Sequence, residues 1–215
     1  MTPTIACVLR SGGRYSADWV ARLKRGIERH TTVPHRFVCL TDVDVPDVET
    51  IALVESWPGW WSKIELFRPG LLTRQTLYLD LDVVIVGDIA PLLRACDAFT
   101  MVHERGTSNY FNSSVMAWNG DMSFLHNAFR ADALQHMHRY RSHPRIGDQA
   151  FISEFLVSEG KKPRTFRGVL GYDAIVSYKR DRCESRPPPS ACVANFHGRP
   201  KPCDFETGWV AEAWK

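Results

Sequence analysis

Apolar and polar residues along the first third of the chain form blocks that alternate between strand and helix spacing. Residues 4–9, 36–40 and 50–53 are short, β-prone apolar runs. Residues 16–30 carry apolar side chains at helical spacing behind a serine that can cap a helix. A strand, a helix and a strand in this order are typical of a parallel α/β sheet. We therefore expect ligands to bind beyond the carboxyl ends of these strands.

The remainder of the chain continues this alternation. Its pattern predicts strands at residues 98–102, 115–118 and 191–196, and helices that begin near Asp121 and Asp148, two residues suited to helix N-caps. A chain of 215 residues is long enough for one substantial core. We expect a single α/β domain with a mostly parallel central sheet flanked by helices.

Composition and charge are those of an ordinary folded protein, with 44% apolar residues, 24% charged residues and a net charge of +3. So small a net charge argues against a nucleic-acid partner. The first apolar run is too short for a signal peptide, and no stretch is long enough to span a membrane. We expect a cytoplasmic protein whose membrane contacts, if any, are peripheral. Cys7 and Cys39 lie in apolar runs, which predicts that they are buried.

One stretch, residues 77–86, interrupts its apolar pattern with two carboxylates, Asp80 and Asp82. Burying an ionised carboxylate without a partner is costly, so both need a counter-charge. In an extended segment alternate side chains point to the same side, which would let both aspartates hold one cation. Carboxylate oxygens suit Mg²⁺ or Mn²⁺, and these metals often bind substrate phosphates as well. The pattern predicts a metal site for a diphosphate at the end of a strand.

Several short segments support a more specific hypothesis because they occur together and in one order. They are Tyr15, Ser62-Lys63, residues 78–92 around the two aspartates, Asn112-Ser113-Ser114-Val115, Asp148-Gln149 and His197-Gly198-Arg199-Pro200-Lys201-Pro202. Together they resemble family 8 glycosyltransferases, the family of glycogenin and the bacterial lipooligosaccharide galactosyltransferases. The resemblance implies a single GT-A domain over residues 1–215. Residues 1–100 would form its nucleotide-binding half and residues 101–215 the half for the donor sugar and acceptor.

The same resemblance implies a metal-dependent enzyme that transfers a sugar from a nucleotide sugar, usually a UDP-sugar, with retention at the anomeric carbon. The implied metal is Mn²⁺ or Mg²⁺. The residues implied to hold the donor are Tyr15 at the uracil, Lys63 and Asp80 at the sugar nucleotide, Asn112 and Ser113 at the sugar, and Gly198 and Lys201 at the diphosphate. Asp148 and Gln149 would be the catalytic residues at the reacting face of the sugar.

The chain departs from the family pattern at the third metal ligand. The usual motif is His-x-x-Gly-x-x-Lys-Pro-Trp, and an ungapped match places Asn195 at the histidine position, with His197 two residues later. Imidazole is the better Mn²⁺ ligand, and a shift of two residues keeps the side chain on the same side of a strand. We therefore favour His197 beside the two aspartates and keep Asn195 as the alternative. Cys203 replaces the tryptophan, and Ser114 replaces a glycine beside the donor sugar.

Three other hypotheses stay open. Asp80-Leu81-Asp82-Val83-Val84 also fits the nucleophile motif of haloacid dehalogenase-type phosphatases, although that motif normally lies near the N-terminus. Cys183, Cys192, His197 and Cys203 could form a structural zinc site, but their spacing is a weak signal. The chain could also bind a sugar nucleotide without turnover.

The acceptor has no recognisable motif, and a glycan, a lipid-linked sugar or a protein are all compatible with the chain. Trp57, Trp60 and Trp61 could stack on an acceptor sugar, although we expect at least two of them to be core residues. The basic residues of segment 179–186 could bind an acidic glycan or a lipid headgroup.

Overall fold

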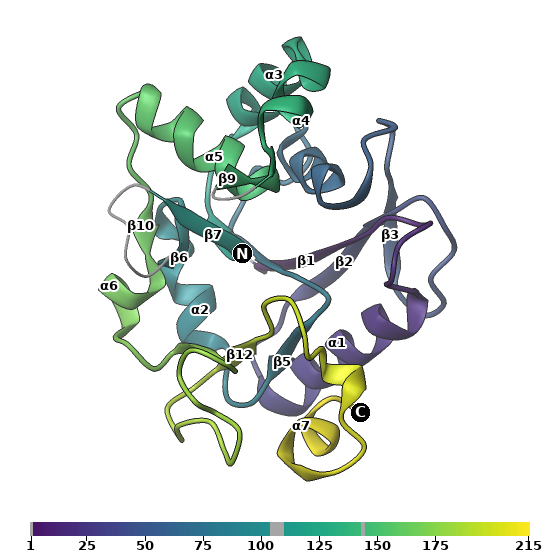
Figure 1. Ribbon diagram of the computed structural model, residues 1–215, viewed down its shortest axis with the longest axis vertical. Coiled ribbons are helices and arrows are strands. Elements are labelled where there is room, and N and C mark those ends of the chain that lie inside the picture. Colours follow the sequence, from purple (N-terminus) through teal and green to yellow (C-terminus); the bar gives the residue numbers. More distant parts are fainter. Residues whose placement is uncertain (1, 104–109, 143–144) are drawn as a thin grey trace.

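A seven-stranded sheet crosses the computed structural model, which describes residues 2–103, 110–142 and 145–215 apart from the side chain of Arg145 (Figure 1). Its strand order is β10-β6-β7-β4-β1-β2-β3. The strands are β1 (Thr4–Leu9), β2 (Arg36–Thr41), β3 (Glu49–Ala52), β4 (Thr76–Leu79), β6 (Thr100–His103), β7 (Phe111–Trp118) and β10 (Arg164–Thr165). Strands β1 to β4 run parallel, as do β6 and β10, whereas β7 is antiparallel to β4 and β6. The predicted mostly parallel central sheet is confirmed.

A second, three-stranded sheet joins the middle of the chain to its C-terminal part. Its order is β11-β12-β5, formed by β5 (Val83–Ile85), β11 (Ile175–Ser177) and β12 (Val193–Asn195). Strand β12 is antiparallel to β5 and parallel to β11. A short pair, β8 (Arg141–Ser142) and β9 (Arg145–Ile146), completes the strands of the described residues.

The strand expected over residues 77–86 is divided between these two sheets. Strand β4 ends at Leu79 and β5 begins at Val83, and the backbone N–H of Val83 donates to the carbonyl oxygen of Asp80 at 3.3 Å. The expectation of one extended segment through Asp80 and Asp82 is therefore wrong, because both aspartates lie on the turn between the sheets. The apolar pattern could not reveal this break, since the strands on both sides of it are fully buried.

Helices cover both faces of the large sheet (Figure 1). They are α1 (Ala17–His30), α2 (Ala90–Arg94), α3 (Ser123–Ala131), α4 (Ala133–Arg139), α5 (Gly147–Ser158), α6 (Phe166–Leu170), α7 (Gly208–Ala213) and the 3-10 helices η1 (Gly59–Phe67), η2 (Ala95–Asp97) and η3 (Pro202–Asp204). Alternate residues of β1 enter two cores. Ile5 and Cys7 belong to the core of α1 and the small sheet, whereas Ala6 and Val8 belong to that of η1, α3 and α5. Burial on both faces explains the continuous apolar run of β1.

The helix predicted to begin at Asp121 is two helices. The expectation that Asp121 is the N-cap is wrong, because Met122 holds that position of α3. The Asp121 carboxylate still accepts a hydrogen bond from the N–H of Ser123 at 2.9 Å, and α3 ends at Ala131. Asp132 follows and caps α4 by accepting from the N–H of Gln135 at 3.4 Å. The apolar pattern predicts one helix, but the side chain of Asp132 binds a backbone N–H and starts a second helix there.

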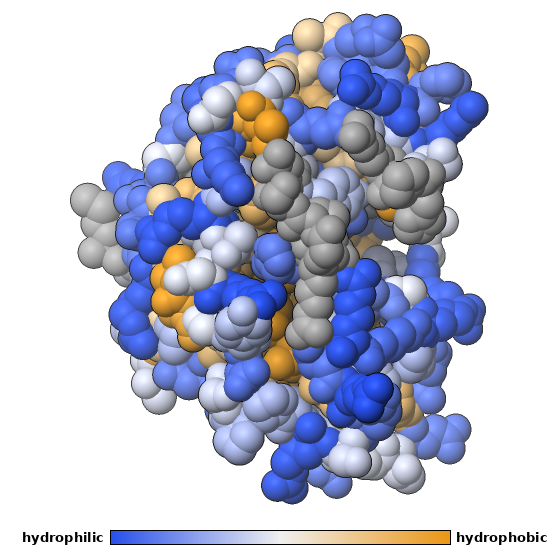
Figure 2. All heavy atoms as spheres, turned by 60° about the vertical axis from the view of Figure 1, so that its left-hand side comes forward, coloured by the Kyte–Doolittle hydropathy of each residue, from blue (hydrophilic) through white to orange (hydrophobic). Residues whose placement is uncertain are grey.

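Side-chain burial confirms the expectations for the aromatic cluster and for two of the cysteines. Trp57 and Trp61 are buried, while Trp60 is 49% exposed. Cys7 and Cys39 are buried free thiols. Within the described ranges no helix has the length and apolar character needed to cross a bilayer. On the face shown in Figure 2, hydrophilic residues predominate and hydrophobic residues form small separate patches.

Candidate active site

A cleft of about 910 Å³ lies at the carboxyl ends of β1 and β4, where the turn between the two sheets forms part of its wall. This volume lies within the usual range of small-molecule sites. The predicted site residues that line it are Tyr15, Lys63, Asp80, Asp82, Asn112, Asp148, Gln149, His197, Gly198 and Lys201. Segments far apart along the chain thus meet in one cleft, and Ser113 is joined to them by hydrogen bonds. The functional roles of these residues stay predictions.

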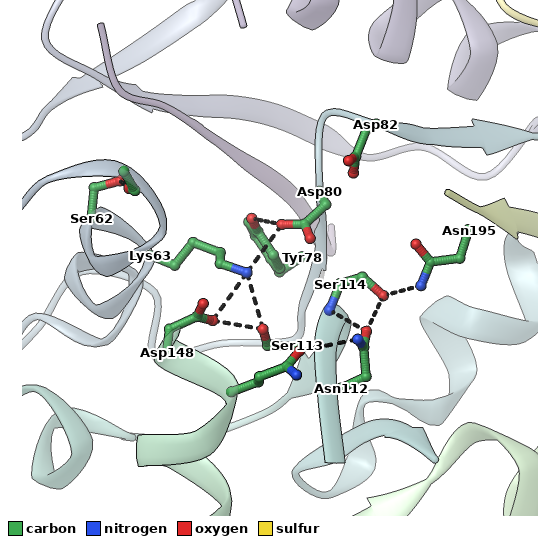
Figure 3. A network of polar contacts seen from close by, with 12 residues as sticks. Ser62, Lys63, Tyr78, Asp80, Asp82, Asn112, Ser113, Ser114, Asp148 and Asn195 are labelled. Carbon is green, nitrogen blue, oxygen red and sulfur yellow. Dashed lines mark hydrogen bonds and ion pairs between the residues drawn. The ribbon is translucent and has the colours of Figure 1, made fainter. Parts of the chain in front are cut away.

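Lys63 is the centre of a polar cluster that links η1, the turn after β4, β7 and α5 (Figure 3). Its ammonium group lies 3.0 Å from Oδ2 of Asp148 and 3.3 Å from Oδ1 of Asp80. It also donates a hydrogen bond to the hydroxyl of Ser113 at 3.0 Å, and that hydroxyl donates to Asp148 at 2.6 Å. The phenol of Tyr78 donates to Asp80 at 2.5 Å. A buried lysine is held here by two carboxylates, as a buried charge requires.

Charge and burial shift the pKa values of this cluster in defined directions. Burial would lower the pKa of Lys63, but the carboxylates of Asp148 and Asp80 outweigh it and hold that pKa above its ordinary value. Burial raises the pKa of Asp80 to about 6, with a further contribution from the negative charge of Asp82 and an opposing one from Lys63. Three carboxylates face two ammonium groups, because Lys201 is the second ammonium at this wall.

Asp82 is buried and is bound by side chains from opposite ends of the chain. The phenol of Tyr15 donates to its Oδ2 at 2.7 Å, and the ammonium group of Lys201 contacts the same oxygen. Lys201 also donates to the carbonyl oxygen of Phe196 at 2.8 Å. Burial and the charge of Asp82 raise the pKa of Tyr15, so its phenol keeps the donor proton. Tyr15 is thus a partner of Asp82, and its role toward a uracil stays a prediction.

A hydrogen-bonded chain of side chains joins the large sheet to the small one. The hydroxyl of Ser114 donates to Oδ1 of Asn112 and accepts from Nδ2 of Asn195. Nδ2 of Asn112 donates to Oε1 of Gln149 at 3.0 Å. Because Nδ2 of Asn195 is bound to Ser114, its amide oxygen points the other way, toward the side of Asp82 (Figure 3). Ser114 therefore orients Asn195, and these are two positions at which the sequence departs from the pattern that it resembles.

The third metal ligand stays a prediction. His197 lines the cleft, but nowhere in the part of the chain that the structure describes do three His, Cys, Asp or Glu side chains gather closely enough to hold a metal ion. The candidate zinc residues are likewise not gathered into such a group. Cys183 and Cys192 are buried, Cys203 is exposed, and all three are free thiols.

Asp148 does not cap its helix as expected. Helix α5 begins at Gly147, with Ile146 as the N-cap, so Asp148 lies in the first turn and its carboxylate points to Lys63. Gly147 has a φ of +75°, and a Cβ there would lie 3.0 Å from Nε1 of Trp60. The local sequence suggested a cap because aspartate is a common N-cap residue. The contact with Lys63 lies far away along the chain, so local spacing could not predict it.

Two tyrosines of the cleft wall were missed as functional candidates. Tyr78 lies two residues before Asp80, so the alternation of side chains along a strand could have placed both on one side. Tyr110 accepts a hydrogen bond from Nε2 of Gln149 at 3.1 Å. No local signal identifies Tyr110, because this contact comes from the packing of α5 against β7. Trp60, named above as a candidate for stacking on an acceptor sugar, packs on Gly147.

Comparison with known proteins bears on the fold. No family model matches the chain, and no curated protein does. The glycosyltransferase GlyE of Streptococcus pneumoniae TIGR4 matches with a TM-score of 0.67 at 15% identity, over 100% of this chain and 59% of GlyE. The galactosyltransferase LgtC, in complex with donor and acceptor sugar analogues, matches with a TM-score of 0.65 at 16% identity. An active-site variant of LgtC matches with 0.69 at 13%, and both LgtC matches cover 98% of this chain and 93% of LgtC.

The chain has the GT-A fold of these glycosyltransferases. The predicted fold is confirmed. Its length corresponds to less than two thirds of GlyE and to nearly the whole of LgtC. At such low identity the likeness concerns the GT-A fold, so the chemistry must be argued from the side chains in the cleft.

Proposed function

We propose that this GT-A protein is a metal-dependent glycosyltransferase that moves a sugar from a nucleotide sugar to an acceptor, with a UDP-sugar as the expected donor and with retention at the anomeric carbon. The observation that carries the proposal is the placement of two carboxylates, Asp80 and Asp82, on the turn that forms one wall of a cleft whose lining also holds Arg10, Arg14, Arg180 and Lys201. Carboxylates at one wall would bind a divalent cation, and the surrounding cations would attract a diphosphate.

The two aspartates of the turn are the residues that would hold the metal. Their donor atoms fit Mn²⁺ or Mg²⁺, since both ions accept carboxylate oxygens. The bound ion would neutralise the negative charge of the departing diphosphate. For the third ligand, the direction of the Asn195 amide oxygen supports Asn195, which revises our preference for His197.

The remaining cleft residues take roles that follow from their positions. Lys201 would pair with the diphosphate, because its ammonium group already lies at the expected metal site. Asn112 and Gln149 form a hydrogen-bonded polar wall that we assign to the donor sugar. Lys63 holds the carboxylate of Asp148 in a fixed position, where it would stabilise the positive charge that develops at the anomeric carbon. Ser113 supports this arrangement through its hydrogen bond to Asp148.

Nucleotide-sugar turnover tests the proposal. The purified protein with Mn²⁺ is expected to release UDP from a UDP-sugar, and UDP with Mn²⁺ should raise the Tm more than either alone. Asp82→Asn should abolish both effects without changing the circular dichroism spectrum. Asp88→Asn is the matched control, because Asp88 is exposed and does not line the cleft.

Three results would contradict the proposal in different ways. Full activity in EDTA would show that the reaction does not need a metal ion. Hydrolysis of p-nitrophenyl phosphate without turnover of nucleotide sugars would favour the phosphatase hypothesis. UDP binding without any turnover, across a panel of UDP-sugars and acceptors, would indicate a sugar-nucleotide-binding protein.

A further inference from the structure

A second, smaller cavity adjoins the main cleft between α6 and β11. Its volume is about 50 Å³. Arg180, Asn195 and His197 line both this cavity and the cleft, so the two spaces share one wall. The remaining lining comes from the end of β6, from α6, from the turn that follows α6 and from β11. Among its described lining residues, Asn195 is the proposed third metal ligand and His197 the alternative to it, and the other lining residues have no part in the proposed handling of the donor.

The cavity adjoins the cleft between the proposed metal site and the wall assigned to the donor sugar. Its wall residue Asn195, the proposed metal ligand, is hydrogen-bonded to Ser114, which is bonded to Asn112, a residue assigned to the donor sugar. The opposite end of the cleft, around Arg10 and Tyr15, is the proposed nucleotide end. An acceptor must approach the sugar and not the nucleotide, so a group held in the small cavity would belong to the acceptor.

The cavity is lined by basic side chains. Arg167 and Arg180 carry permanent positive charges, and His103 and His197 add two imidazoles. Asp181 is the one acid among its described lining residues, and its carboxylate accepts a hydrogen bond from the backbone N–H of Ser177 at 2.7 Å. The charge of this lining therefore favours an anion.

Arg167 is held in place by an aromatic ring. Its guanidinium carbon lies 3.3 Å from the centre of the Tyr172 ring, and Tyr172 is 66% exposed. Stacking on a ring preorganises the planar guanidinium and leaves its N–H groups available at its edge, where they can bind a carboxylate or phosphate in bidentate fashion. A cavity of this size is far below the roughly 300 Å³ of ordinary small-molecule sites, so it suits a single charged substituent and not a sugar ring.

We propose that this cavity receives the anionic substituent of the acceptor, so that the acceptor is a sugar bearing a carboxylate or a phosphate. This inference rests on the proposed glycosyltransferase function. The residues that would bind the anion are Arg167 and Arg180, and the sugar ring of the acceptor would lie in the main cleft beside the donor sugar.

The test compares the binding of three sugars that differ in charge, measured by ligand-observed NMR in the presence of UDP and Mn²⁺. Methyl β-D-glucuronide carries a carboxylate, glucose 6-phosphate carries a phosphate, and methyl β-D-glucoside is neutral. We expect at least one anionic sugar to bind tenfold or more tightly than the neutral one, since charge-assisted hydrogen bonds contribute more than neutral ones. The two anionic sugars distinguish a uronic acid acceptor from a phosphorylated one.

Arg167→Gln should remove this preference, whereas Arg164→Gln should preserve it. Arg164 is a matched control because it lies three residues away, outside both cavities, in an exposed ion pair with Asp97. Equal binding of charged and neutral sugars, binding of none of them, or an unchanged preference in Arg167→Gln would overturn the inference. UDP binding by the unmodified protein is measured separately, so a failed donor site is distinguished from a failed acceptor pocket.

Discussion

The hydroxyl of Ser114 accepts a hydrogen bond from the side-chain amide of Asn195 and thereby joins β7 of the large sheet to β12 of the small one. These two residues are also the places where the chain departs from the glycine and the histidine of the family pattern. Because Ser114 and Asn195 are hydrogen-bonded to each other, the effect of either replacement depends on the other. The serine fixes an amide whose oxygen faces the side of Asp82, where a metal ligand is expected (Figure 3).

The first prediction concerns the metal ligand. Asn195→Ala should weaken Mn²⁺ binding at least tenfold, because it removes a preorganised oxygen ligand, and His197→Ala should weaken it less. Electron paramagnetic resonance of free Mn²⁺ measures both affinities without any turnover. Ser114→Ala should produce a smaller loss than Asn195→Ala, because it frees the amide without removing it. A larger effect of His197→Ala than of Asn195→Ala would restore histidine as the ligand.

The second prediction concerns the buried ion pair. Lys63 is 8% exposed and Asp148 is 3% exposed, and Lys63→Met would leave the carboxylates of Asp148 and Asp80 without their ammonium partner. Breaking a buried pair on one side typically costs about 3 kcal/mol, which urea unfolding would detect. The double variant Lys63→Met/Asp148→Asn should recover part of this loss. Arg164→Met, at an exposed pair with Asp97, is the control and should change stability by about 0.5 kcal/mol or less.

The third prediction concerns acid stability, which we attribute in part to His126 of α3. This side chain is 4% exposed, and neither ring nitrogen has a hydrogen-bond partner among the described residues. Burial lowers its pKa, so the unfolded chain takes up a proton near pH 6.5 that the folded protein does not. The free energy of unfolding should therefore fall as the pH drops below about 6.5.

The replacement His126→Phe isolates this contribution. Urea unfolding at pH 7.5 and at pH 5.5 should show a smaller loss of stability on acidification in His126→Phe than in the unmodified protein. His138→Gln, an exposed position of α4, should leave the loss unchanged. Identical pH dependence in His126→Phe and the unmodified protein would show that His126 is not the titrating group.

The fourth prediction concerns the segment that follows β5. A Cβ on Gly87 would lie 2.3 Å from the carbonyl oxygen of Ala191, which is backbone and cannot rotate away. Gly87→Ala should therefore separate this segment from the strand region of β12 and lower stability by about 2 kcal/mol. Gly13→Ala is the control, because the nearest atom there is 4.0 Å away. Equal stability of the two variants in thermal unfolding would refute the close approach.

The order of the first strands and helix could be predicted because each carries its own local pattern. Strand β1 is buried on both faces and reads as one apolar run, and α1 has a single apolar stripe. The cleft residues could be named because short motifs in the right order resemble a family. What no local pattern predicts is the division between β4 and β5, because β5 pairs with β12, whose residues lie far along the chain.

The chemistry of individual residues was harder to predict than their presence in the site. Aspartate is a residue type that often caps helices, yet the carboxylate of Asp148 binds the ammonium group of Lys63 in η1. The choice between Asn195 and His197 rested on ligand preference and on the alternation of side chains along a strand. The packing of Asn195 against Ser114, across two sheets, is a tertiary contact that spacing along the chain does not encode.

The contact between Lys201 and Asp82 has a consequence for the sequence of binding events. Lys201, at the N-cap of η3, supplies the counter-charge of Asp82. Under the proposed function, a metal bound at Asp82 would replace this ammonium group, and Lys201 would then pair with the diphosphate of the donor. Ion and nucleotide should consequently promote each other's binding, with Lys201 as the residue that couples them.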